Sequence, residues 1–263
     1  MPLALVAAWE IGAAYADQPW IFPRFTSVMR RLAEPFADFY AQGSLAGNTL
    51  TSILRVSVGV VLAALAGIGL GLVLGAVRTL RGLFEPILEI LRPLSPIAWL
   101  PFAIAVFKLR TLGDVVGLSH TGTLLDRVQL GMVFVIFWGG FFPVFVNTMD
   151  GVMGVRRSYL LLARTLGASR RQMFLKVYLP AALPAVITGL RLGASSSWRV
   201  IIAAEMLPGS QSGIGYMLIY AADQAAMDVV VAAMIIIGVI GALVNLFMRL
   251  AMGAFVRWRT EET

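Results

Sequence analysis

The 263-residue chain contains no cysteine and a single histidine, His120. The missing thiols exclude disulfides, thiolate nucleophiles and zinc or iron sites built on cysteine. One histidine excludes a His-rich metal site and any catalytic set that needs two histidines. Charged residues are also scarce, at 13% of the chain, where soluble domains carry about 25%. Such a surface would expose large apolar patches to water, so a soluble globular enzyme is excluded.

Apolar residues, by contrast, make up 59% of the chain, and its mean hydropathy is +0.85. A helix that crosses about 30 Å of hydrocarbon needs about 20 mostly apolar residues. The sequence therefore predicts a single domain that is an all-α membrane protein with about six transmembrane helices. The predicted spans are residues 3–16, 51–77, 94–107, 130–147, 184–206 and 229–250.

Three segments have special features. The first span is short and contains Glu10, and we read it as a retained anchor rather than a signal peptide. Residues 24–40 are too polar to span and carry an apolar helical stripe, which predicts an interfacial helix. Prolines within 94–107 predict a broken helix, and broken helices tend to line cavities.

Small residues recur every four positions along the second span. This spacing places them on one helix face, where a second helix backbone can approach closely. The residues are Gly59, Ala63, Gly67, Gly71 and Gly75.

The predicted topology accounts for the net charge of +7. With both termini in the cytoplasm, the loops on the inner side carry 12 basic and 5 acidic residues, and those on the outer side carry 6 basic and 7 acidic. This asymmetry matches the positive-inside rule and predicts that both termini lie in the cytoplasm. Nucleic acid is therefore not needed to explain the basic charge, and no nucleic-acid partner is expected.

The inward loop 151–183 has its own pattern. Helical spacing of its apolar residues is followed by Gly167, which predicts a left-handed cap, and Ser169 with Gln172 predicts a capping box that starts a second helix ended by Pro180. Five arginines and a lysine surround the apolar positions. Two interpretations remain open: a docking surface for a protein, or a segment folded onto lipid headgroups. The candidate docking residues are Tyr159, Leu162, Ala163, Gly167, Ser169, Met173, Phe174, Val177 and Pro180.

At this point the chain resembles a known family. Residues 161–167, followed after nine residues by 177–180, are similar to the EAA loop of ABC-importer permeases, with the same spacing from glycine to Leu-Pro. The segments around it (92–101, 204–216) resemble the permeases for nitrate, sulfonates, taurine and bicarbonate. Leu161 stands where the family usually has glutamate, and Leu162 replaces the first alanine.

The resemblance implies a type I importer permease without catalytic activity of its own. It implies a homodimer, two separate ATPase subunits that hold ATP and Mg²⁺, an external substrate-binding protein and contact with membrane lipid. No cofactor or metal is expected in this chain, because its two lysines lie outside any phosphate-binding glycine loop. In such an importer the inward loop would transmit ATPase closure to the helix bundle.

Polar residues inside the predicted spans are candidates for the solute pathway. A charge within the bilayer is costly and needs a partner or a cavity. Arg199 follows a run of serines, and Glu205 is expected to pair with it or to cap the next loop, whereas Arg55 is expected to reach outer headgroups. The candidate pathway residues are Pro96, Trp99, Asn147, Ser195, Ser196 and Arg199.

Two rival functions remain. An ion-gradient-driven secondary transporter needs an acidic group within the membrane, for which Glu205 is available outside the first span. An importer permease for a different small organic solute would share every feature described. A membrane-embedded enzyme is disfavoured, because no nucleophile and base can be assembled around His120.

Overall fold

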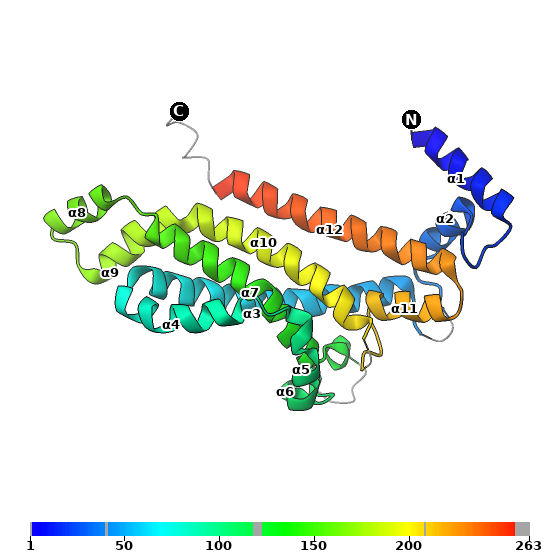
Figure 1. The fold of residues 1–263 in the computed structure, drawn as a ribbon, viewed down its shortest axis with the longest axis horizontal. Coiled ribbons are helices and arrows are strands. Elements are labelled where there is room, and N and C mark those ends of the chain that lie inside the picture. The colour runs from blue at the N-terminus through cyan, green and yellow to red at the C-terminus, as the bar shows by residue number, and fades with distance from the viewer. Residues whose placement is uncertain (1, 40–41, 118–122, 208, 256–263) are drawn as a thin grey trace.

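The computed structural model describes residues 2–39, 42–117, 123–207 and 209–255, and His120 lies outside them. These residues form helices and no strand, with only two isolated β-bridges among them. Figure 1 shows the long helices side by side along the molecule, which confirms the all-α prediction. In chain order they are α1 (Pro2–Ala16), α2 (Phe25–Ala33), α3 (Leu45–Ala76), α4 (Arg78–Leu91), η1 (Pro96–Trp99), α5 (Leu100–Phe107), α6 (Leu112–Val116), η2 (Leu124–Arg127), α7 (Leu130–Met153), α8 (Arg157–Thr165), α9 (Arg170–Met173), η3 (Phe174–Tyr178), α10 (Leu179–Glu205), α11 (Ile214–Asp223) and α12 (Met227–Phe255).

Four described helical runs are long and apolar enough to cross a bilayer: 45–76, 130–153, 170–205 and 227–250. Helix α4 and the pair η1–α5 form a fifth candidate, bent by 91°. The predicted span 94–107 is therefore the second half of a bent pair, as its prolines suggested. The predicted span 3–16 is helix α1, with 15 residues, shorter than the roughly 20 that a bilayer requires.

Helices α3 and α7 run parallel and touch along the small-residue stripe. A β-carbon added to Gly59 would lie 2.4 Å from Ile136, and one added to Gly71 would lie 2.6 Å from Thr148. Gly67 and Gly75 meet Val144 and Val152 in the same way. The predicted close approach is confirmed, because at these positions only glycine leaves room for the neighbouring helix.

Helix α10 packs antiparallel against α7 on a face next to the one that α3 covers, and it also contacts α3. A β-carbon on Gly193 would lie 2.8 Å from the Gly140 carbonyl oxygen, and one on Gly189 would lie 3.1 Å from that of Pro143. The hydroxyl of Ser197 donates to the carbonyl of Ile136 at 3.0 Å. Helices α3, α7 and α10 thus form the central layer of the bundle, and α12 lies beside α10 (Figure 1).

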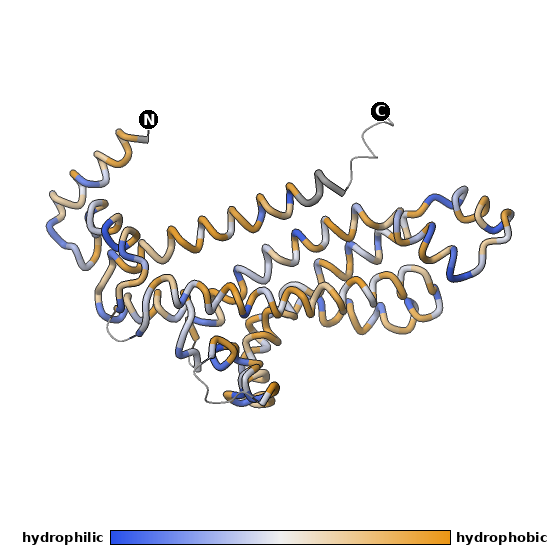
Figure 2. Tube along the Cα trace, turned by 180° about the vertical axis from the view of Figure 1, so that it is seen from behind, coloured by the Kyte–Doolittle hydropathy of each residue, from blue (hydrophilic) through white to orange (hydrophobic). Residues whose placement is uncertain are grey.

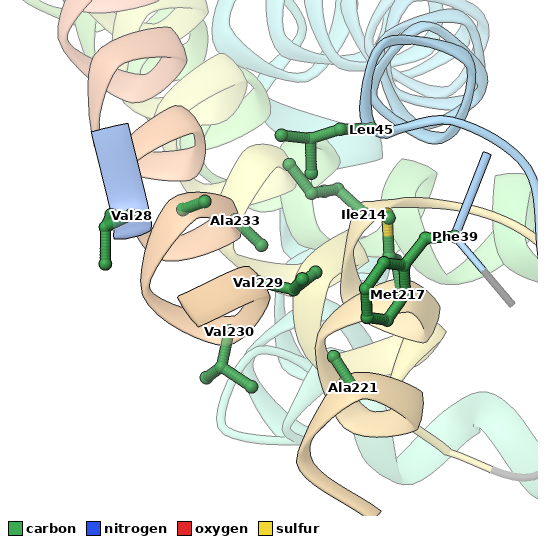
Figure 3. Close-up of a cluster of buried hydrophobic side chains, with 10 residues drawn as sticks. Val28, Phe39, Leu45, Ile214, Met217, Ala221, Val229, Val230 and Ala233 are labelled. Atoms are coloured by element: carbon green, nitrogen blue, oxygen red, sulfur yellow. The ribbon is translucent and has the colours of Figure 1, made fainter. Parts of the chain in front are cut away.

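At the end of the bundle where α3 begins, helices α2, α11 and α12 close around a small core. Figure 3 shows Ile214 and Met217 of α11 and Val229 of α12 near Leu45, and Val28 of α2, a member of the same cluster, lies apart from them in this view. Helix α2 covers residues 25–33, a shorter stretch than the predicted interfacial helix 24–40, and Tyr40 lies outside the described residues. We call this the outer end of the molecule and the opposite end the inner end, after the orientation that the charge asymmetry predicts.

The opposite, inner end carries the predicted loop 151–183. Helix α8 and the start of α9 project beyond the other helices there (Figure 1), and Figure 2 shows that this end is rich in hydrophilic residues. Pro180 does not end the second helix as predicted, because the helix continues from Arg170 to Glu205. A π-helical turn at Phe174–Tyr178 precedes Pro180, which therefore lies in the first turn of α10. Pro180 removes one N–H from the hydrogen-bond ladder of this continuous helix, and the irregular π-helical turn lies where that bond is missing.

Candidate functional site

A cavity of about 480 Å³ lies between η1, α7 and α10, near the middle of the long helices. Pro96 lines it from η1, Asn147 from α7, and Ser196 with Arg199 from α10. Four of the six predicted pathway residues therefore surround one space, although they come from three separate parts of the sequence. Trp138 and Arg92 complete the polar and aromatic lining.

Arg92 and Arg199 are the only charged residues that line this central cavity in the described part of the chain. Neither side chain forms an ion pair or a hydrogen bond with another described residue, although both are exposed. Asn147 donates one amide hydrogen to the Pro143 carbonyl at 2.8 Å, which leaves its other amide hydrogen available. The cavity thus offers two unpaired guanidinium groups and neutral donors, a lining suited to a small anion.

One wall of the cavity is held rigid by aromatic rings. The Trp138 ring lies 5.1 Å from that of Trp99 and 5.4 Å from that of Phe142, measured between ring centroids. Trp99 belongs to this aromatic cluster but does not line the cavity. Ser195 also points elsewhere, because its hydroxyl donates to the Asn245 side chain of α12 at 2.9 Å. These two predicted pathway residues support the wall and the α10–α12 contact instead.

A second polar site lies at the outer end and is fully buried. The Arg55 guanidinium contacts the Glu205 carboxylate at 2.7 Å, and both side chains are at most 1% exposed. The prediction that Arg55 reaches outer headgroups is wrong, and Glu205 pairs with Arg55 rather than with Arg199. Arg55 also donates to the carbonyls of Arg127 and Ser212, at 2.6 and 2.7 Å.

The Glu205 carboxylate binds the first turn of α11. It accepts hydrogen bonds from the Ser52 hydroxyl at 2.7 Å and from the Gly215 N–H at 3.1 Å. Asn48 accepts from the Gly213 N–H at 2.8 Å, and Gly213 has a φ of 115°. A side chain there would collide with the carboxylate. The expectation that Glu205 caps the following loop is met where that loop ends and α11 begins, and described groups satisfy the Glu205 carboxylate.

The inner arm, α8 through α9, has the local structure that the sequence predicted. Gly167 has a φ of 71°, its N–H donates to the Arg164 carbonyl, and the Ala168 N–H donates to that of Ala163. These two bonds are the Schellman pattern that satisfies a helix end. The capping box is also present, since Ser169 and Gln172 each accept from the other's backbone N–H.

The apolar side chains of the arm divide into two sets. Helix α8 has no buried residue, and Leu162 and Leu166 are 59% and 77% exposed. Met173 is buried, and Phe174 packs against the cluster formed by α3, α7 and α10. Exposed apolar surface for a partner therefore lies on α8, and the second part of the arm is attached to the bundle. The outward apolar side chains are Tyr159, Leu161, Leu162 and Leu166.

The sequence is similar to those of known membrane transport proteins. Residues 59–261 match the family model described as "Binding-protein-dependent transport system inner membrane component". A putative ABC transporter permease protein of Methanocaldococcus jannaschii is 40% identical over 259 residues, which cover 98% of this chain and 90% of that protein. The bicarbonate transport system permease CmpB of Synechococcus elongatus is 34% identical, over 93% of this chain and 84% of its own. The taurine transport system permease TauC of Escherichia coli is 30% identical, over 99% and 88%.

Solved structures agree on the fold. An inward-facing form of the MetNI methionine ABC transporter matches with a TM-score of 0.63 over 80% of this chain and 95% of that one, at 15% sequence identity. A likeness at that identity shows the fold alone, whereas the family match covers most of the sequence. The structural likeness supports the helical fold, and the family match supports the assignment to a transport component. The chain thus belongs to the binding-protein-dependent inner membrane transport components, the permease subunits of ABC importers.

Proposed function

We propose that this permease carries a small anionic solute, of the nitrate, sulfonate, taurine or bicarbonate class, through its central cavity. The observation that carries the proposal is the pair of unpaired arginines, Arg92 and Arg199, which among the described residues are the only charges lining a cavity of about 480 Å³. The relatives named for bicarbonate and taurine, both small solutes with an anionic group, support the same class. An uncharged organic solute would leave both guanidinium groups without a partner.

The energy source in this proposal is a separate ATPase subunit that binds ATP and Mg²⁺ and docks on α8. The exposed leucines of α8 and the arginines beside them form an apolar patch in a basic frame. The chain itself carries out no catalysis. Because the helix that begins at Arg170 continues through η3 into α10, a displacement of α9 by a docked subunit would move the α10 wall of the cavity as a rigid body.

Two copies of the chain enclose the pathway in this proposal. Helix α4 has no buried residue in one copy, and Leu83, Ile87 and Ile90 are exposed on it. Arg92 follows α4 directly and is also exposed. An arginine at the bilayer centre costs about 2.5 to 3.5 kcal/mol on insertion scales. A second copy that closes the cavity against lipid removes that cost. In this proposal both termini lie in the cytoplasm, and an external binding protein docks at the outer end.

A cross-linking experiment tests the docking assignment, and the absence of cysteine makes single-cysteine variants unambiguous. We expect Leu162→Cys in α8 to form a cross-link to the co-expressed ATPase subunit, whereas Val115→Cys, an equally exposed apolar position in α6 at 66%, forms none. If Leu162→Cys reacts with lipid-borne reagents and never forms a cross-link to the ATPase subunit, the arm lies on the membrane instead.

Uptake by proteoliposomes that contain the whole transporter tests the solute class. We expect uptake of at least one of nitrate, bicarbonate, taurine or methanesulfonate when ATP is supplied inside, and none without ATP. Uptake driven by an ion gradient without the ATPase would favour the gradient-driven alternative. Uptake of only an uncharged solute would overturn the anion assignment.

A further inference from the structure

Arg92 lines two cavities at once. It lies at the end of α4, where the bent pair turns toward η1, and it borders the central cavity described above. It also borders a second cavity of about 210 Å³ between α4 and α7, nearer the inner end. Phe142 and Val146 line both cavities as well. The two spaces are therefore neighbours, and Arg92 is the only charged residue common to both in the described part of the chain.

The charges of the two cavities are opposite in sign. The central cavity has Arg92 and Arg199, and the inner cavity has Glu85, Glu89 and Asp150 beside Arg92. Glu85, Glu89 and Arg92 are spaced by four and three residues, which places them on one stripe of α4. A solute anion that moves from the central cavity toward the inner end therefore leaves a cationic space for an acidic one.

Arg92 has no fixed partner on either side. It forms no ion pair, and neither do Glu89 and Asp150, among the residues that the structure describes. Glu85 contacts Arg81 at a distance of 3.9 Å. The buried pair of Arg55 and Glu205, by contrast, has a contact of 2.7 Å and several further bonds. The side chain of an arginine is long enough to reorient between neighbouring spaces.

We propose that Arg92 alternates between the solute anion in the central cavity and the carboxylates of the inner cavity, so that the carboxylates compete with the anion and drive its release. This inference rests on the proposed function, since it requires an anion in the central cavity. Arg92 and Arg199 together hold the anion. When Arg92 turns to Glu89 or Asp150, one of the two cationic contacts is lost and the anion dissociates more readily.

The competition predicts opposite effects for substitutions on the two sides. Arg92→Gln removes a charged contact to the anion and should weaken its binding about tenfold. Glu89→Gln and Asp150→Asn remove competitors and should tighten anion binding, about three- to fivefold each, the range of an exposed ion pair. Tighter binding with slower release should also lower both the KM and the kcat of uptake in these two variants.

The experiment uses the assembled transporter in lipid nanodiscs. Wild-type protein is titrated with nitrate, bicarbonate, taurine and methanesulfonate, and the probe with the highest affinity is then used for every variant. Arg199→Gln serves as the variant that touches only the central cavity, and Arg30→Gln, an exposed residue paired with Glu34, as the charge-removal control. Uptake by proteoliposomes is measured for the same variants.

The outcomes separate this inference from the proposed function. Tighter binding and a lower kcat in Glu89→Gln or Asp150→Asn support the competition. If Arg199→Gln weakens binding while both acidic variants bind as wild type does, the central cavity holds the anion but the competition is absent, and the inference is overturned. If no probe binds to wild type, or neither arginine variant changes binding, the proposed function fails as well.

Discussion

The guanidinium group at the outer end and those of the central cavity differ in their partners. Arg55 is fully buried and donates to Glu205, Arg127 and Ser212 at distances of 2.6 to 2.7 Å. Arg92 and Arg199 are exposed to a cavity and have no described partner. An arginine whose bonds are all satisfied within the chain stabilises one arrangement of helices. An arginine without partners can bind something that the chain does not contain.

The largest effect that tests this contrast should come from removing one member of the buried pair. Glu205→Ala leaves Arg55 buried without its carboxylate and also frees the N–H of Gly215. We expect a loss of stability of about 3 to 5 kcal/mol, measured by thermal unfolding of the purified protein in detergent. The double variant Arg55→Met with Glu205→Leu should recover much of this loss, because no unpaired charge remains.

A smaller loss of stability should come from disturbing the contact between α3 and α7. Gly71→Ala places a methyl group 2.6 Å from Thr148 and 2.8 Å from the Phe145 carbonyl oxygen. We expect it to destabilise the protein by about 1 to 3 kcal/mol. Gly69→Ala on the same helix meets nothing within 4 Å and should be neutral or stabilising, by up to about 1 kcal/mol. Equal unfolding temperatures for both variants would contradict the packing described.

A third effect concerns the inner arm. Gly167→Ala puts an alanine at a φ of 71°, which costs about 1 to 2 kcal/mol for a residue with a β-carbon. Because nothing in the structure lies within 4 Å of an added β-carbon there, the strain is confined to the cap between α8 and α9. We expect unfolding of the bundle to be unchanged and solute-stimulated ATPase activity to fall. A bundle that loses stability while ATPase coupling stays intact would show that the arm has a structural role only.

Local features of this molecule could be predicted from the sequence, and features that join distant residues could not. The cap at Gly167 and the capping box of Ser169 and Gln172 depend on residues within a few positions of each other, and both are present. The small-residue stripe of α3 also predicted a helix contact, since every fourth residue shares a face. The sequence did not identify α7 as the helix that packs against this stripe, because the spacing of small residues describes only the α3 side of the contact.

Arg55 shows why the rest was missed. Its partner Glu205 is 150 residues away in the sequence, and from one chain position an arginine near a helix end could equally well reach lipid headgroups. The position of Arg92 between the second and third predicted spans predicts an inner loop, and only the 91° bend after α4 brings it to the central cavity. The sequence predicts a helix end at Pro180, whereas the structure has a π-helical turn before it and a helix that continues beyond it.

The central claim is that partnered arginines hold the fold and that the arginines of the central cavity hold the solute. Arg199→Gln tests it most directly, with anion affinity of the assembled transporter and thermal unfolding measured on the same preparation. We predict binding of the preferred anion weakened about tenfold, or about 1.4 kcal/mol, and stability changed by less than about 0.5 kcal/mol. Unchanged affinity together with a clear loss of stability would contradict the account, because Arg199 would then serve the fold as Arg55 does.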